Sequence, residues 1–394
     1  MCQERLKKLV AGKHRIIFYF SIVILMIGSF FVWGENQSKL DRKTPAEISD
    51  YITEKMTDCY KNDNTNKCYK ANAEDFINQF KISSITTVFN QNEKKSEFFK
   101  KCHLVAHYLG QAAYRKYGSI IAVFLQGNRA CLGGVYHGAV EGYFMEQGIT
   151  DIKSDKVKQL VSRVCGVPED FDEPQKFTEC NHGLGHATML LTENDLPQAL
   201  NLCDALSFRN EQELCYSGAL MANADSFGGE DHPTKYIKAD DPLYPCDILE
   251  QQQKRQCYIY GVLARFQNDL SKSISVCSIV PTEFQNDCFE TIGRDRTMIS
   301  ADPAELKMQC GQIKKDEWRK DCISGSSYNL VIRFGAVSNI PIDYCDITET
   351  KYKNDCYMQI FRGLKRVTRK KEVIENFCGK ITDGNYRNEC LNSI

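Results

Sequence analysis

The sequence lacks the short motifs that mark several common classes of enzyme. It contains no glycine-rich P-loop, no Gly-x-Ser-x-Gly nucleophile motif, no His-Glu-x-x-His zinc motif and no Cys-x-x-Cys-His haem attachment. It also lacks an excess of positive charge, because 50 lysines and arginines are balanced by 51 aspartates and glutamates. A nucleic-acid-binding surface depends on basic residues, so nucleic acid is not an expected partner.

Long apolar runs are scarce too, with one exception near the N-terminus. Residues 16–33 carry no charge and would span about 27 Å as a helix, close to the thickness of a bilayer's hydrocarbon core. Basic residues precede this run and Glu35 follows it, a pattern that keeps the N-terminus cytoplasmic. We therefore predict a cytoplasmic tail at 1–15, a transmembrane anchor at 16–33 that makes the membrane a partner, and a periplasmic or extracellular bulk. The alternative is a cleaved signal peptide, whose apolar region is usually only about 7–15 residues long.

Cysteine, in contrast, is abundant. The chain has 19 cysteines, and setting aside Cys2 on the predicted cytoplasmic side leaves 18, an even number that allows nine disulfides. Disulfides persist in oxidising compartments, so the cysteine content and the predicted export support each other.

Most of the cysteines recur in pairs with a regular spacing. The last six pairs are separated by 11 or 12 residues, and their first members recur about every 31 to 43 residues, which is typical of stacked helix–turn–helix repeats. These pairs are Cys203/Cys215, Cys246/Cys257, Cys277/Cys288, Cys310/Cys322, Cys345/Cys356 and Cys378/Cys390. A bridge within each pair would clamp an antiparallel helical hairpin. Local pairing would also join Cys59 to Cys68, Cys102 to Cys131 and Cys165 to Cys180, although spacing alone does not fix connectivity.

The predicted fold is therefore mostly α-helical, a transmembrane helix followed by a solenoid-like array of disulfide-clamped α-hairpins. Strand signals are few. The β-branched run Ile82–Phe89 can form a short strand, but a helix is favoured. We expect a polar stalk at 34–51, a helical domain rich in histidine and cysteine at 52–230, and clamped helical repeats at 231–394.

Five of the seven histidines lie in three short segments that resemble one another. The segments begin at Cys102, Cys131 and Cys180. The first and third each hold two histidines four residues apart, and the second has a glutamate four residues after its histidine, so each pair shares one helical face. The chemistry-bearing residues are His103, His107, His137, Glu141, His182 and His186.

Paired imidazoles on one helical turn can chelate a metal ion. We predict that the five histidines and Glu141 bind one crowded ion or two adjacent ions of zinc, copper or iron, all of which accept imidazole ligands. Glu141 is also the candidate catalytic base for water activation, and the chemistry would be hydrolytic or redox. Sequence does not decide whether the protein is an enzyme.

Other interpretations remain open at this stage. The histidines can hydrogen-bond within a polar helix interface and bind nothing, and the adjoining cysteines can be thiolate ligands or nucleophiles instead of disulfides. His232 lies in a predicted solvated loop. From a different class of function, the helical array can be a non-catalytic scaffold that binds a protein or glycan partner on its concave side.

Overall fold

Helices make up all the regular structure of the described chain. The computed structural model describes residues 43–61, 65–92, 102–225, 234–266 and 268–393, and no strand occurs in these ranges. Within them, no helix is both long enough and apolar enough to span a bilayer. The predicted anchor at 16–33 and the cytoplasmic tail at 1–15 lie outside the described residues.

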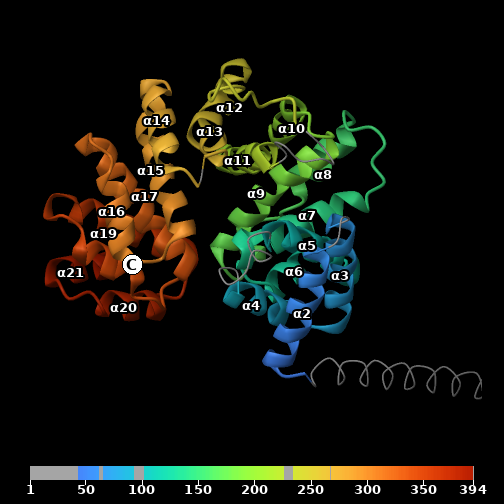
Figure 1. The fold of residues 1–394 in the computed structure, drawn as a ribbon, viewed down its shortest axis with the longest axis horizontal. Helices are drawn as coiled ribbons and strands as arrows, with labels where there is room; N and C mark the ends of the chain where they lie inside the picture. The colour runs from blue at the N-terminus through green and yellow to red at the C-terminus, as the bar shows by residue number, and fades with distance from the viewer. Residues whose placement is uncertain (1–42, 62–64, 93–101, 226–233, 267, 394) are drawn as a thin grey trace, which may run out of the picture.

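The first half of the chain forms the blue-to-green part of Figure 1. Its first helix begins at Pro45, inside the segment expected to be a polar stalk, because Thr44 and Glu47 form a capping box that starts the helix. The preference for a helix at Ile82–Phe89 is confirmed by α4. The helices are α2 (Pro45–Tyr60), α3 (Thr65–Gln79), α4 (Ile82–Asn92), α5 (Cys102–Tyr117), α6 (Ile120–Gln126), α7 (Gly134–Met145), α8 (Asp155–Arg163) and α9 (Pro174–Leu191).

The second half continues as hairpins of one short and one longer helix. A π-helical turn, Cys257–Gly261, interrupts this pattern between α12 and α13. The helices are α10 (Leu196–Cys203), α11 (Arg209–Asp225), α12 (Gln251–Gln256), α13 (Val262–Ala264), α14 (Leu270–Ile279), α15 (Thr282–Ile299), α16 (Pro303–Gly311), α17 (Asp316–Phe334), α18 (Ile340–Ile347), α19 (Lys353–Val367), α20 (Lys371–Gly379) and α21 (Gly384–Asn392).

Nine disulfides hold these helices together, and their pairing confirms the prediction of local bridges. The six regularly spaced pairs all form, as do Cys59–Cys68, Cys102–Cys131 and Cys165–Cys180. In a typical unit, Cys310 near the end of α16 bonds to Cys322 in the second turn of α17. In this unit, and in the hairpins α10–α11, α14–α15 and α18–α19, the bridge thus fastens a short helix to the longer helix that follows it.

Glycines let three pairs of long helices cross with their backbones in contact. A Cβ atom at Gly185 of α9 would lie 2.0 Å from the carbonyl oxygen of Cys215 in α11, and one at Gly293 of α15 would lie 1.9 Å from that of Cys322 in α17. Any larger residue would push these helices apart. The third crossing, between α5 and α7, is formed by Gly110 and Gly138 in the same way.

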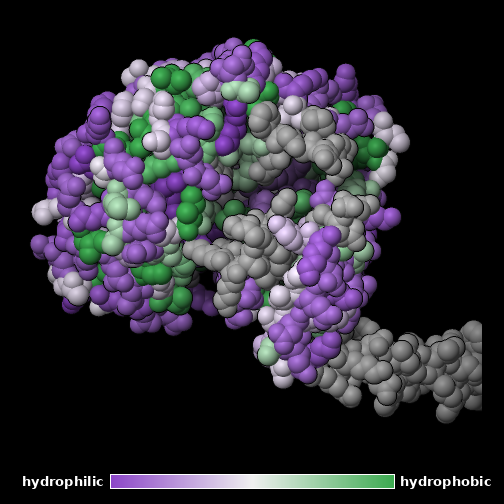
Figure 2. Space-filling model, in the orientation of Figure 1, coloured by the Kyte–Doolittle hydropathy of each residue, from purple (hydrophilic) through white to green (hydrophobic). Residues whose placement is uncertain are grey.

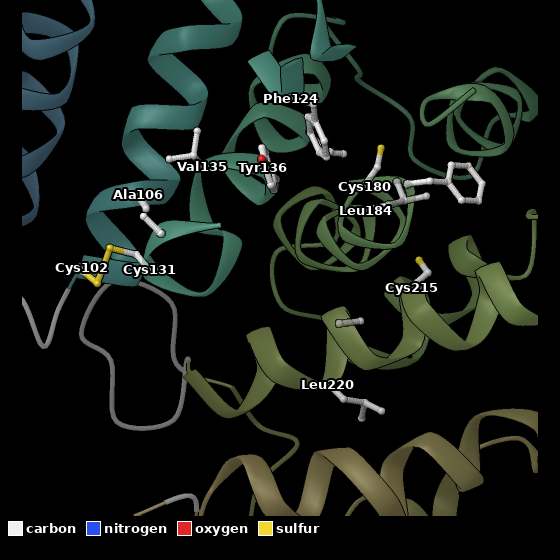
Figure 3. Packing of buried hydrophobic residues seen from close by; sticks show 14 of the residues in the cluster. Cys102, Ala106, Phe124, Cys131, Val135, Tyr136, Cys180, Leu184, Cys215 and Leu220 are labelled. Carbon is white, nitrogen blue, oxygen red and sulfur yellow. A yellow bond between two sulfur atoms is a disulfide. The ribbon is translucent and has the colours of Figure 1, made fainter. Parts of the chain in front are cut away.

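The core between the first helices is packed by small and aromatic side chains (Figure 3). Ala106 of α5 and Val135 of α7 are both fully buried beside the Cys102–Cys131 bridge. Tyr136 stacks on Phe124 with ring centroids 4.2 Å apart. This packing fixes the positions of α5 and α7, which carry three of the predicted site histidines.

The chain curves into an arc whose C-terminal hairpins return to the N-terminal half (Figure 1). Arg129 donates from Nη1 to the carbonyl oxygen of Ile332 in α17, at 2.7 Å, and Arg369 donates to the carbonyl oxygen of Pro168. The space-filling view shows the molecule hollowed between the two sides of the arc (Figure 2). The array is therefore curved more tightly than an open solenoid.

Candidate metal centre

Five histidines from three helices converge in the N-terminal half of the arc. His103 and His107 come from α5, His137 from α7, and His182 and His186 from α9. Eight pairs among these rings have centroids between 4.7 and 6.0 Å apart. The predicted convergence of the three segments is thus present in the structure.

The two histidines of α5 point the same nitrogen at each other. Nδ1 of His103 lies 2.7 Å from the carbonyl oxygen of Cys131, and Nδ1 of His107 lies 2.8 Å from Oε1 of Glu141. Because a carbonyl and a carboxylate only accept hydrogen bonds, both Nδ1 atoms carry the proton. The two Nε2 atoms are then left as lone-pair acceptors, and they face each other at 3.1 Å.

A left-handed turn within the short segment η2 (Ala130–Gly133), which directly precedes α7, aims the carbonyl of Cys131 at His103. Cys131, Leu132 and Gly133 have φ angles of 54°, 59° and 79°, a region that non-glycine residues rarely adopt. Such strain persists where the surrounding structure imposes it, often at functional sites. Here the strained residues directly precede the first turn of α7, beside the histidines.

The first histidine of α9 follows the same pattern. Nδ1 of His182 lies 2.9 Å from Oγ of Ser217, and that hydroxyl already donates to the carbonyl oxygen of Leu214 at 2.7 Å. The oxygen of Ser217 therefore accepts a hydrogen bond from the Nδ1–H group of His182. The Nε2 atom of His182 is left with its lone pair, as in His103 and His107.

The remaining two histidines carry buried ring nitrogens with no hydrogen-bond partner among the described residues. These atoms are Nδ1 of His137 and Nε2 of His186. The two rings stack at 4.7 Å with an angle of 15° between their planes. A buried polar atom without a partner is costly, so each nitrogen fits the role of a metal ligand.

A second carboxylate reaches the cluster from α9. Oε2 of Glu179 lies 3.4 Å from Nε2 of His137, while its Oε1 is held by Arg129 at 2.7 Å and by Gln175 at 2.9 Å. Gly133 leaves room for it, since a Cβ there would lie 2.7 Å from Oε2. Glu179 thus lies at the edge of the centre.

Glu141 is fixed on the far side of His107. Its Oε1 accepts from Nδ1 of His107, and its Oε2 accepts from Nε2 of Gln111 at 2.8 Å. A carboxylate in this position holds a histidine ring and raises the basicity of its other nitrogen. Glu141 also groups with His107 and His186, with one ligand atom of each within 4.8 Å of the others.

Burial favours the neutral form of four of the five histidines. It lowers the pKa of His103 to about 3, with the neighbouring His107 adding to the effect, and it lowers the pKa of His182 to about 4. The pKa values of His137 and His186 are also lowered, first by burial and then by the surrounding imidazoles. Neutral imidazole is the form that binds metal.

Two further groups of three residues have the spacing of metal ligands. One joins His103 and His107 to His137, and the other joins His137 to His182 and His186; each residue's ligand atom lies within 4.8 Å of the others. The three groups share members, so they form one continuous cluster. It has enough nitrogen donors for one ion or for two adjacent ions.

Sequence reasoning missed Glu179, Gln111 and Ser217. Glu179 lies three residues before His182 and seven before His186, and Gln111 lies four after His107. Both spacings belong to the same helical faces, so extending the pattern by one turn would have found them. Ser217 comes from α11, and no spacing within one segment indicates it.

The alternative of thiolate ligands is wrong for the neighbouring cysteines. Cys102, Cys131 and Cys180 are all in disulfides. His232 lies outside the described residues. The chain matches no protein-family model, and neither the curated proteins nor the solved structures contain a significant match.

Proposed function

We propose that this protein binds zinc, copper or iron through its five clustered histidines. The observation that carries the proposal is the pair of facing Nε2 atoms of His103 and His107, 3.1 Å apart, with both Nδ1 atoms committed as donors. Two lone pairs at this distance repel unless a cation lies between them. With metal–nitrogen bonds of about 2.05 Å, a separation of 3.1 Å gives an N–metal–N angle of roughly 100°, between square and tetrahedral coordination.

A polar helix interface without metal explains the geometry less well. It would require a proton shared between His103 and His107, yet burial lowers the pKa of His103 to about 3. It would also leave the buried nitrogens of His137 and His186 without partners. A metal ion satisfies all of these atoms together.

The residues around the histidines have distinct parts in this proposal. His103, His107 and His137 form one ligand group, and His182 and His186 extend it toward α11. Glu141 orients His107, while Glu179, which reaches the edge of the cluster, is better placed than Glu141 to take a proton from bound water. A bound zinc ion would supply an activated water, whereas copper or iron would supply electron transfer.

We also propose that the metal centre lies outside the cytoplasm, tethered by residues 16–33. Support comes from the nine disulfides, because such bridges persist in oxidising compartments. The uncharged apolar run and the basic residues before it supply the second argument.

Metal analysis of the full chain tests the metal proposal. The protein is purified without chelators and its zinc, copper and iron are measured by mass spectrometry, beside His103→Ala, His107→Ala, His186→Ala and the control His232→Ala. We expect bound metal in the wild type and the control and its loss in the three cluster variants. A wild-type chain that stays metal-free, even after incubation with each ion, would overturn the proposal.

A further inference from the structure

A cavity adjoins the metal centre on the inner side of the arc. Its volume is about 280 Å³, which is small for a ligand site and suits a molecule of modest size. Residues of α9, among them His182 and Glu179, form one part of the wall together with Arg129 and Leu132. Residues of α11, α12, the π-helical turn, α15, α17 and α19 form the rest. The cavity therefore connects the histidine cluster with the C-terminal hairpins.

The wall contains three arginines, and two of them already face an acid. Arg129 pairs with Glu179 at 2.7 Å, and Arg294 pairs with Asp295 at 2.6 Å. The third acid in the wall, Glu213, pairs with Arg209 and Arg255.

Arg366 of α19 is the third arginine of the wall, and it takes part in none of these ion pairs. It is half-buried and lines the cavity, and no acidic partner contacts it among the residues that the structure describes. The guanidinium group has a planar set of donors that matches a carboxylate or a phosphate. Arg366 is thus the one arginine of the wall that no acidic side chain contacts among the described residues.

A π-helical turn presents an aromatic ring to the same cavity. Tyr260 lies in the turn Cys257–Gly261, its ring centroid 6.3 Å from that of His182, and the guanidinium of Arg294 lies 3.7 Å from its ring centroid. Single π-helical turns inside helices occur frequently at functional sites. Tyr260 therefore connects the arginine side of the cavity with the metal side.

The wall also contains apolar side chains. Leu132, Leu214, Met221 and Met298 line the cavity beside its polar and charged groups. Such a lining favours a ligand that has an apolar body besides its charge.

We infer that this cavity binds a small organic anion, with its carboxylate or phosphate on Arg366 and its body beside Tyr260, directed toward the metal ligand His182. The inference deepens the proposed function and rests on it, because the metal would act on the end of the ligand that reaches His182. The ligand class is an apolar or aromatic body of modest size bearing one oxoanion.

The test measures binding of phenyl phosphate, benzoate and uncharged benzyl alcohol to the full chain by calorimetry, in metal-loaded and metal-free protein. We expect phenyl phosphate or benzoate to bind, and benzyl alcohol to bind at least tenfold more weakly. Arg366→Gln should weaken binding of the anion roughly tenfold or more, the effect of losing a charge-assisted hydrogen bond. Arg366→Lys should retain part of the affinity because it keeps the charge.

Lys365→Gln is the matched control, because it removes a neighbouring exposed charge of α19 outside the cavity wall. It should leave anion binding unchanged. Inorganic phosphate alone should bind more weakly than phenyl phosphate; equal binding would reject the organic body as part of the ligand.

Two results would overturn the inference: no binding of either organic anion, or equal binding to wild-type and Arg366→Gln protein whose thermal unfolding is unchanged. Metal content is measured on the same samples. If the metal-loaded protein fails to bind either anion, the inference that the cavity binds an organic anion is rejected and the metal proposal still stands. Arg366-dependent binding to a protein that never takes up metal rejects the metal proposal alone.

Discussion

Gly138 of α7 lies directly against the carbonyl group of His107 in α5. A Cβ atom at position 138 would be 2.0 Å from that oxygen. The closest crossing of the two helices therefore occurs at a residue of the candidate metal centre. The spacing between His107 and His137 depends on a missing side chain.

Replacing Gly138 with alanine should consequently disrupt the centre. We expect the Gly138→Ala chain to lose most of its bound metal, because the methyl group forces α5 and α7 apart and the cluster loses its geometry. Metal analysis and thermal unfolding are the measurements. Gly311→Ala is the control, since nothing lies within 4 Å of a Cβ there. Full metal content in Gly138→Ala protein would contradict the role of this crossing.

Glu141 should tune the centre without being essential to it. In the Glu141→Gln chain, the charged acceptor beside Nδ1 of His107 becomes a neutral amide. Loss of a partner that orients a ligand typically lowers metal affinity about 10- to 100-fold. Competition with a chelator measures the change, and Glu146→Gln, at the exposed end of α7, should show none. Complete loss of metal, as in His107→Ala, would instead indicate direct ligation.

Acid should destabilise the metal-free protein. The pKa of His103 is lowered from 6.5 to about 3 and that of His182 to about 4, so below pH 6.5 the unfolded chain takes up protons that the folded chain does not. Stability is therefore fully present above about pH 6.5 and falls as the pH drops toward 4 and then 3, by about 1.4 kcal/mol per pH unit for each such histidine.

Chemical unfolding at several pH values between 7.5 and 4.5 measures this slope. His103→Gln protein should show a shallower dependence, because it has lost one of the titrating groups. The same slope in both chains would show that His103 is not held neutral by the fold.

Each disulfide should stabilise its own hairpin, so removal of one bridge far from the histidines should leave the metal centre intact. Replacing both Cys310 and Cys322 with serine opens a loop with a sequence separation of 12 residues, which the chain-entropy relation values at about 3 kcal/mol. We expect the free energy of unfolding to fall by about that amount, with bound metal unchanged. Non-reducing peptide mapping should recover the nine local bridges. Long-range bridges in that map would contradict the clamped-hairpin fold.

The hairpins were predictable because their bridges are local. A cysteine in the last turn of one helix and another in the second turn of the next give a constant separation, as in Cys310 and Cys322, and this constancy is visible in the sequence. The pairs His103/His107 and His182/His186 were predictable for the same reason, because one helical turn places both rings on one face.

The relation between helices was harder to predict. Ser217 approaches His182 only because Gly185 and Gly218 let α9 and α11 touch, and Arg129 reaches α17 only because the arc closes. The curvature of the array results from many small packing angles between helices, and no regular spacing of residues in the sequence indicates these angles. The π-helical turn at Cys257–Gly261 also lacks a distinct sequence pattern.

The local character of the bridges has a consequence for access to the interior. Among the described residues, the largest sequence separation that a bridge spans is 29, between Cys102 and Cys131, so no disulfide there joins the two sides of the arc. Those sides meet through contacts such as the hydrogen bond from Arg129 to Ile332, which water can replace. The two sides of the arc can therefore separate without the breakage of any of these nine bridges, whereas each bridged hairpin cannot.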